Sequence, residues 1–429
     1  AALVADREGL DLAVRFVDRV ARPEDPEVAA RALARLPTGA ARFLGLGDRL
    51  LLRAGSRLAP LAPRVVVPPA RRRLRQLVGH LVVDARDPAL ARHLARARAV
   101  GVRLNLNLLG EAVLGEREAA RRAERTLDLL RREDVDHVSI KVSSLVSQIS
   151  PWDTPGTVAR VVERLRPLYE AARERSPRAF VNLDMEEYRD LHLTLEVFTT
   201  LLDEPELRDL EAGIALQAYL PDSVDAFERL AAFATDRVAR GGAGIKVRLV
   251  KGANLSMERV EAELRGWEQA PYGSKAEVDA NYLRLVERAL RPELAGRVRV
   301  GVASHNLYDV ALAHLLAQAR GVTASMDVEM LQGMAPAQAR AVGADVGGVL
   351  LYTPVVAPED FDVAISYLVR RLEENAQPHN FLHALFTEGP SAVGDQEARF
   401  RASVAEMATV PTDRRRRARC PPAPPRFAN

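Results

Sequence analysis

The segment Gly244-Ile245-Lys246-Val247-Arg248-Leu249-Val250-Lys251-Gly252-Ala253-Asn254 indicates both the fold and the place of a functional site. Its aliphatic and β-branched residues, bounded by glycines, predict a β-strand. Side chains alternate between the two faces of a strand, so Lys246, Arg248 and Val250 share one side. Two cations are costly to bury without partners, so we expect this face to line a cavity for an electron-rich or anionic ligand. An edge strand with one wet face is the alternative.

The composition describes an ordinary soluble chain. Of its 429 residues 48% are hydrophobic, and 61 basic residues against 58 acidic ones give a net charge of only +3, so we expect no nucleic-acid partner. Cys420 is the single cysteine, which excludes a disulfide within the chain and fits a reducing compartment. No apolar run approaches the ~20 residues of a membrane helix, and the first residues show no signal-peptide pattern. The first residue is not Met, so we expect a processed or cut N-terminus.

Three regions follow from the hydrophobic pattern. The pattern predicts a helical arm over residues 1–98, strands alternating with amphipathic helices over residues 99–385, and an irregular linker over residues 386–429. Eight strand–helix units predict a (β/α)8 TIM-like barrel, with a long insertion at 254–274. A doubly wound open sheet is the runner-up, but no Gly-x-Gly-x-x-Gly turn follows an early strand. The expected strands are Val102–Leu109, His137–Val142, Ala179–Asp184, Ile214–Tyr219, Ile245–Val250, Val298–Ala303, Val322–Val328 and Gly348–Tyr352.

Polar residues stand where most of these strands end. Functional groups of a barrel collect at the carboxyl ends of its strands, so we expect these side chains to converge. They are Glu111, Lys141, Asp184, Gln217, Arg248, Lys251, Ser304, His305, Glu329 and Tyr352. The set offers neither a nucleophile with an adjacent base nor the spacing of a metal site, so no metal is expected. It suits a bound cofactor that performs the chemistry.

A helix after the last strand adds a second signal. Tyr367, Arg370, Arg371 and Glu374 lie at i, i+3, i+4 and i+7 and therefore share one face. Paired arginines suit a planar carboxylate, which a guanidinium binds with two parallel hydrogen bonds. A salt-bridged surface helix remains the alternative reading of this face.

Seven motifs, in order over about residues 105–380, resemble proline dehydrogenase, in particular that half of the bifunctional proline utilisation A proteins. The motifs are Leu108-Leu109-Gly110-Glu111-Ala112, Ser139-Ile140-Lys141-Val142-Ser143-Ser144, Asn182-Leu183-Asp184-Met185-Glu186-Glu187, Leu216-Gln217-Ala218-Tyr219, Val247-Arg248-Leu249-Val250-Lys251-Gly252-Ala253, Ser304-His305-Asn306 and Tyr367-Leu368-Val369-Arg370-Arg371-Leu372-Glu373-Glu374-Asn375. Departures are Asn107, where the family often has Asp, and Asn254 with Leu255 in place of an aromatic pair.

The resemblance implies a distorted FAD-binding barrel. It would oxidise L-proline to Δ1-pyrroline-5-carboxylate by hydride transfer to flavin N5 and pass electrons to a membrane quinone, as the first step of proline catabolism to glutamate. Asp184 and Arg248 would be catalytic. The substrate would be held by Lys141, Tyr352, Tyr367, Arg370, Arg371 and Glu374. The cofactor would be held by Met185, Gln217, Arg248, Val250, Lys251, Gly252, Ala253, Ser304 and His305.

The resemblance also implies partners and a location. We expect a cytoplasmic protein, peripheral at the inner face of the membrane, with an aldehyde dehydrogenase domain or partner. Phe427-Ala428-Asn429 resembles the start of that domain. Alternatives are a dehydrogenase of hydroxyproline or another cyclic imino acid, a catalytically inactive scaffold, and a DNA-binding regulator. The N-terminus lacks the basic strand followed by two helices that such a regulator needs.

Overall fold

The computed structural model describes residues 6–110, 112–150, 152–377, 380–387 and 391–416. Glu111, Cys420 and the terminal residues 427–429 therefore lie outside the described part of the chain.

Eight parallel strands close into a barrel, because the last strand pairs with both the first and the one before it. The predicted (β/α)8 class is confirmed. A two-residue strand, β1 (Val83–Asp84), pairs with β9 outside the ring. The barrel strands are β2 (Arg103–Leu108), β3 (His137–Lys141), β4 (Phe180–Asp184), β5 (Ala212–Gln217), β6 (Ile245–Val250), β7 (Val298–Ala303), β8 (Met326–Leu331) and β9 (Leu350–Val356).

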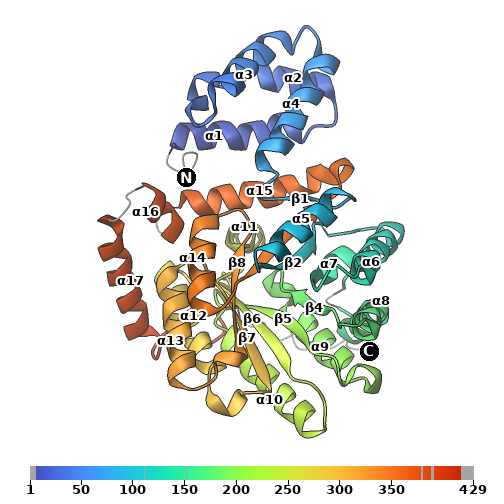
Figure 1. The fold of residues 1–429 in the computed structure, drawn as a ribbon, viewed down its shortest axis with the longest axis vertical. Helices are drawn as coiled ribbons and strands as arrows, with labels where there is room; N and C mark the ends of the chain where they lie inside the picture. The colour runs from blue at the N-terminus through green and yellow to red at the C-terminus, as the bar shows by residue number, and fades with distance from the viewer. Residues whose placement is uncertain (1–5, 111, 151, 378–379, 388–390, 417–429) are drawn as a thin grey trace, which may run out of the picture.

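Helices surround the strands, as Figure 1 shows. The outward residues of the strands, such as Val247 and Leu249, are fully buried against them and form the main hydrophobic core. Capping residues stabilise the start of several helices. Ser274 and Glu277, for example, form a reciprocal capping box at the start of the helix that begins at Lys275. These helices are α5 (Ala89–Ala99), α6 (Glu116–Arg131), α7 (Val142–Leu145), α8 (Thr154–Glu174), α9 (Leu191–Leu202), α10 (Ser223–Ala239), α11 (Leu255–Arg265), α12 (Lys275–Ala289), α13 (Leu307–Ala319), α14 (Pro336–Val346) and α15 (Phe361–Ala376).

Two strands differ from their predicted bounds by more than two residues at an end. Residues 323–325 form a 3-10 turn, so β8 begins only at Met326 and extends to Leu331. The β-branched residues around Val322 resemble a strand in sequence, but Gly321, at φ +68°, reverses the chain there after α13. β9 continues to Val356 because each of its residues from Leu350 to Val355 pairs in register with β2. Tyr352 consequently lies within its strand and not at the end.

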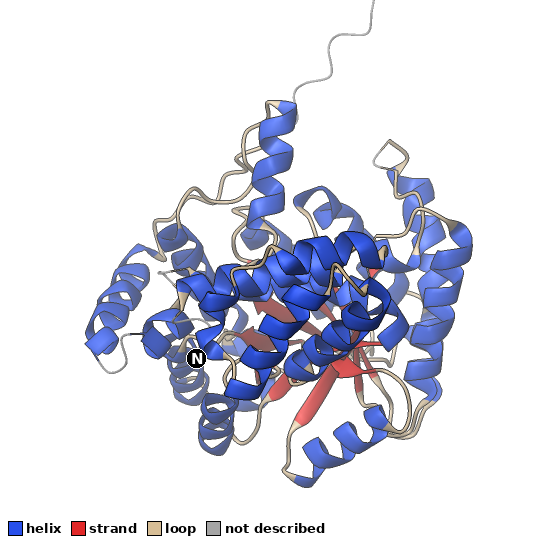
Figure 2. Ribbon diagram, turned by 90° about the horizontal axis from the view of Figure 1, so that it is seen from above, coloured by secondary structure: helices blue, strands red, loops and turns tan. Residues whose placement is uncertain are grey.

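The N-terminal arm has its own small core. Buried residues from α1 (Arg7–Phe16), α2 (Pro26–Ala34) and α4 (Pro63–Val78) pack together with α3 (Leu46–Leu58). The arm lies against α15 (Figures 1 and 2), where Arg75 Nη1 donates to the Pro358 carbonyl at 3.0 Å. Four of the five residues at 71–75 are arginines. Arg71 Nε donates to the Val20 carbonyl at 3.1 Å, so part of this basic cluster stabilises the packing of the arm.

The expectation of an irregular segment from 386 onward is wrong for most of its described residues. α16 (Phe381–Thr387) and α17 (Ala392–Glu406) are helical, and Tyr308 of α13 stacks on Phe400 with ring centres 5.4 Å apart. The buried face of α17 consists of small and polar residues, so its sequence carries little hydrophobic periodicity and packing decides the helix. Residues 411–416 lack regular structure, yet the guanidinium of Arg416 lies 5.0 Å from the Trp267 ring centre.

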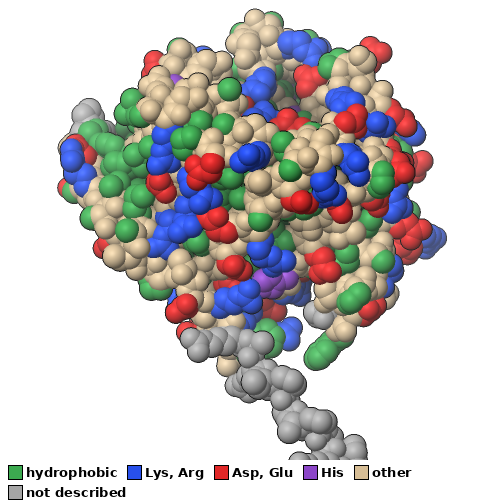
Figure 3. Space-filling view, turned by 90° about the horizontal axis from the view of Figure 1, so that it is seen from below, with side chains coloured by type: hydrophobic (Ala, Val, Ile, Leu, Met, Phe, Trp, Pro, Cys, Tyr) green, Lys and Arg blue, Asp and Glu red, His purple; other side chains and the backbone are tan. Residues whose placement is uncertain are grey.

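Surface features accord with the balanced composition. On the face opposite the arm, basic and acidic side chains are interspersed (Figure 3). Among the described residues, none of the helices combines the length and the apolar character that a membrane crossing requires.

Candidate active site

The interior of the barrel carries charge on β6. Lys246 and Arg248 both point inward and are 1% and 7% exposed. Arg248 Nε lies 2.8 Å from Oε2 of Glu329, and its Nη1 lies 3.4 Å from Oδ1 of Asp184. Burial by itself would lower the pKa of Arg248, but the two carboxylates raise that pKa, so the guanidinium stays charged. The predicted polar face of the strand thus lies inside the barrel with its charges paired.

Asp184 connects this arginine to Tyr352. The Tyr352 hydroxyl donates to Asp184 Oδ2 at 2.8 Å and accepts a hydrogen bond from the Asn107 side chain. The guanidinium carbon of Arg248 lies 4.5 Å from the centre of the Tyr352 ring, a cation–π contact. Burial raises the pKa of Asp184, although Arg248 and the Tyr352 hydroxyl favour its charged form. Three strands therefore hold Asp184, Arg248 and Tyr352 as one network.

α15 presents the predicted face toward this network. Arg371 Nη1 pairs with Glu374 Oε2 at 2.7 Å, and its guanidinium carbon lies 5.3 Å from the Tyr367 ring centre. Burial raises the pKa of Tyr367, and the charges of Arg371, Glu374, Arg248 and Arg370 also act on its hydroxyl. The side chains of α15 and β6 consequently share one electrostatic environment at the mouth of the barrel.

Two buried donors on this face are unpaired. Within the described chain, neither Nε of Arg371 nor the Tyr367 hydroxyl has a hydrogen-bond partner. Buried polar groups normally find partners, so both atoms are available to a hydrogen-bond acceptor. Lys141, at the end of β3, adds a further cation; its Nζ lies 3.6 Å from Glu186 Oε1, and its charge acts on Asp184.

A second group of predicted residues lies at the ends of β5, β6 and β7. Lys251 Nζ lies 2.6 Å from Asp279 Oδ1 and 2.8 Å from Asp309 Oδ2, and Ser304 Oγ donates to Asp309 at 2.8 Å. Burial opposes the charge of Lys251, but the two aspartates raise its pKa. Lys251 therefore already pairs with two protein carboxylates.

Backbone carbonyls organise the neighbouring loop. Gln217 Nε2 and Asn254 Nδ2 both donate to the Glu186 carbonyl, at 2.9 and 2.8 Å, while Gln217 Oε1 is buried without a described partner. Gly252 adopts φ +118°, and a Cβ there would lie 2.5 Å from the Tyr219 ring, so a glycine is required. Met185 is buried, Val250 is half-buried and Ala253 is exposed.

His305 lies beside the last strands. The Leu331 amide donates to its Nε2 at 2.9 Å, and burial lowers its pKa to about 4. The ring is therefore neutral at physiological pH. The charge of Arg371 on α15 also lowers the pKa of His305, so the imidazole and α15 share one electrostatic environment.

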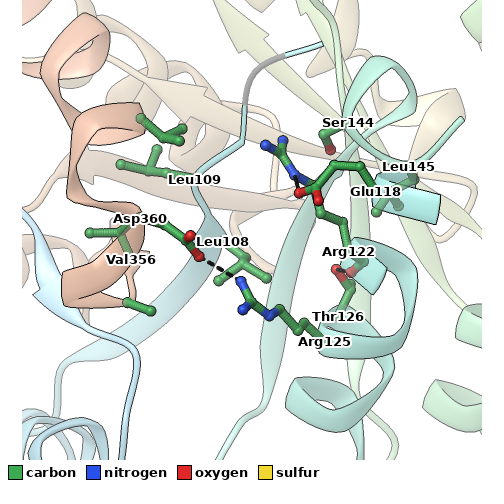
Figure 4. Close-up of a pocket in the computed structure, with 12 residues that line it drawn as sticks. Leu108, Leu109, Glu118, Arg122, Arg125, Thr126, Ser144, Leu145, Val356 and Asp360 are labelled. Carbon is green, nitrogen blue, oxygen red and sulfur yellow. Dashed lines mark hydrogen bonds and ion pairs between the residues drawn. The ribbon is translucent and has the colours of Figure 1, made fainter. Parts of the chain in front are cut away.

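A small cavity of about 30 Å³ lies elsewhere, between β2, α6, α7 and the start of α15 (Figure 4). Arg125 Nη1 pairs there with Asp360 at 2.5 Å and so fixes the beginning of α15. The volume holds little more than one water molecule, so this cavity is no substrate site.

Three aspartates that organise the site were absent from the predicted set. Asp327 alternates on β8 with Glu329, which that set contained, as Lys246 alternates with Arg248 on β6. That shared alternation could have revealed Asp327. Asp279 and Asp309 lie on helices, and no local signal links either to Lys251.

Comparisons with known proteins agree with this geometry. Residues 90–384 match the family described as proline dehydrogenase. A solved structure of proline utilisation A from Corynebacterium freiburgense is 54% identical, with a TM-score of 0.74, over 88% of this chain and 37% of that one. Bifunctional protein PutA of Klebsiella aerogenes is 29% identical over 58% of this chain and 19% of its own. Proline dehydrogenase of Deinococcus radiodurans is 27% identical over 59% of this chain and 73% of its own.

The share of each chain sets the scope of these matches. This chain spans about a fifth of the length of the curated bifunctional relatives, so the likeness concerns one part of those proteins. The family match covers well over half of the chain, including β2 to β9 and the whole of α15. The chain therefore belongs to the proline dehydrogenase family.

Proposed function

We propose that the protein catalyses the FAD-dependent oxidation of L-proline to Δ1-pyrroline-5-carboxylate, the first step from proline toward glutamate, and passes the electrons to a quinone. The observation that carries the proposal is the meeting of two groups at the barrel mouth. One is the Asp184–Arg248–Tyr352 network, and the other is the arginine face of α15.

The carboxylate of proline would bind between α15 and β3. Nε of Arg371 and the Tyr367 hydroxyl are buried donors without described partners, and Arg370 and Lys141 add positive charge. A planar carboxylate satisfies such donors by accepting parallel hydrogen bonds from a guanidinium. The 2.7 Å ion pair between Arg371 and Glu374 would hold the guanidinium in position before the substrate binds.

The cationic surroundings would also set the state of the substrate amine. Hydride leaves a carbon next to nitrogen most easily when the amine is neutral. Nearby positive charges lower the pKa of an ammonium group, so Lys141 and the arginines favour loss of that proton. Asp184 would orient Arg248 and Tyr352, and the rings of Tyr352 and Tyr367 would pack against the substrate ring.

The residues at the strand ends fit a flavin. Gln217 Oε1 is a buried acceptor without a described partner, and Arg248 is a fixed cation on the same inward side of the barrel. FAD, when bound, supplies the acceptor for the hydride. Met185, Gln217, Arg248, Val250 to Ala253, Ser304 and His305 would hold it, with Ser304 and Lys251 joined through Asp309.

The test is the visible spectrum of the purified protein. Flavin bands that bleach anaerobically with L-proline are expected, and a protein that binds no flavin or does not bleach contradicts the proposal. Hydroxyproline is the matched second substrate. The Tyr352 and Tyr367 rings would pack against the substrate ring, so slower bleaching is expected with hydroxyproline; faster bleaching would favour the hydroxyproline dehydrogenase.

The wider setting is also a proposal. We propose that a membrane quinone accepts the electrons at the inner face of the cell membrane, and that an aldehyde dehydrogenase domain or partner consumes the product. The bifunctional names of several relatives support this pairing. Quinone reduction in the presence of L-proline, measured with and without added membranes, tests the first of these steps.

A further inference from the structure

A column of buried charge lies beneath the proposed site. Glu329 is 1% exposed and bridges the two cations of β6, with Oε1 2.6 Å from Lys246 Nζ and Oε2 2.8 Å from Arg248 Nε. Lys246 Nζ is also 2.9 Å from Asp327 Oδ2. At the far end, Arg103 and Arg299 pair with Asp327 at 2.7 and 2.9 Å. The column therefore runs along the barrel axis from the bottom to Arg248.

The neighbouring strand leaves room for this column. Gly301 of β7 is in register with Arg248, and a Cβ on it would lie 2.3 Å from Glu329 Oε1 and 2.9 Å from Lys246 Cε. Its φ lies outside the positive region, so a side chain here would disturb the packing and not the backbone: the Glu329 carboxylate and the end of the Lys246 side chain would have to shift. The sequence thus keeps a residue without a side chain beside Glu329, as a fixed position of its carboxylate requires.

We propose that Glu329 is the residue that positions Arg248, and that Lys246 and Asp327 hold Glu329 in place. This inference rests on the proposed function, because it concerns the orientation of Arg248 toward the bound flavin. Three contacts surround the guanidinium: Glu329 Oε2 lies 2.8 Å from Nε, Asp184 Oδ1 lies 3.4 Å from Nη1, and the Tyr352 ring centre lies 4.5 Å from the guanidinium carbon. Asp184 and Tyr352 also belong to the proposed substrate site, whereas Glu329 does not.

Glu329→Gln is the first test. It removes one of three inward carboxylates and leaves Asp184 and Asp327 to balance Lys246 and Arg248, so the barrel should still fold. A misplaced catalytic group can slow a reaction by about 10²-fold. We expect the limiting rate of flavin reduction by L-proline to fall at least about tenfold, while KM for proline changes less than about threefold.

The flavin reduction potential separates positioning from simple charge removal. Loss of a negative charge with Arg248 in place would raise the potential, because the reduced flavin becomes better stabilised. Displacement of Arg248 would lower it. We expect a lower potential in Glu329→Gln, and a raised potential with an unchanged rate overturns the inference.

Gly301→Ala is the second variant and keeps every charge. The new methyl group pushes the Glu329 carboxylate away, so the same fall in rate and potential is expected. Glu211→Gln is the control, because it breaks the 3.0 Å pair with Arg299 at the far end of the barrel and should leave both quantities unchanged. Wild-type values in both Glu329→Gln and Gly301→Ala refute the inference alone. A wild-type protein that does not bleach with proline refutes the proposed function instead.

Discussion

Arg371→Met should weaken proline binding while FAD still binds. The Arg371 side chain is 12% exposed, its Nη1 pairs with Glu374 at 2.7 Å, and its Nε is the buried donor available to the substrate. Loss of one desolvated, charge-assisted contact costs about 2–5 kcal/mol. In the variant Arg370 and Lys141 would still attract the proline carboxylate, so we expect a loss of binding free energy at the lower end of this range. About 2 kcal/mol corresponds to a ~30-fold rise in KM.

The stability cost of this change should be small. The Glu374 side chain is 34% exposed, so water can solvate its carboxylate once Arg371 is lost, and partly exposed pairs contribute less than about 1 kcal/mol. The assay is steady-state KM for L-proline together with the flavin absorbance of the purified variant. Arg288→Met on α12, which breaks the 2.6 Å pair with Glu228 of α10, is the control. A KM within twofold of wild type would assign Arg371 to the salt bridge alone.

Three further outcomes are expected. Arg248→Met should slow flavin reduction by about 100-fold and lower the flavin potential with little change in KM, because a fixed cation stabilises developing negative charge. Stopped-flow reduction and spectroelectrochemistry measure the rate and the potential. If both were unchanged, Arg248 would not lie beside the flavin. FAD should be held without a covalent bond, so acid precipitation should release all yellow colour, and colour in the pellet would contradict this. Burial raises the pKa of Asp190 from 3.8 to about 7, so its ionisation destabilises the fold as pH rises through that interval. Asp190→Asn removes this destabilisation, which is at most about 4 kcal/mol of folding free energy at pH 8, and should therefore raise Tm at pH 8 and leave Tm near pH 4 unchanged. An equal gain in Tm at both pH values in thermal scans would contradict this origin.

Much of the barrel could be predicted from short-range pattern. The alternation of Lys246 and Arg248 between aliphatic neighbours identified an inward polar face, because the pleat of a strand fixes the direction of each side chain. The i, i+3, i+4 spacing of Tyr367, Arg370 and Arg371 identified one face of a helix, because helical geometry depends only on the sequence separation. Both predictions needed no knowledge of distant residues.

Long-range contacts decided the remainder. β9 extends past Tyr352 because β2 offers it partners through Val355, and α17 is helical although its buried face is small and polar. Of the two readings left open for the α15 arginines, the salt bridge is confirmed for Arg371, which pairs with Glu374. Arg371 Nε has no hydrogen-bond partner among the described residues, and carboxylate binding stays a prediction.

The sequence by itself determined which residues could carry charge into the barrel, since strand alternation is a local property. Only the tertiary structure decided how that charge is balanced. Glu329 lies 81 positions after Arg248 in the chain, yet its carboxylate is 2.8 Å from that guanidinium because β6 and β8 flank the same glycine-bearing strand. The energy of a buried ion pair depends on separation in space and on exclusion of water, and neither quantity is written in the local sequence.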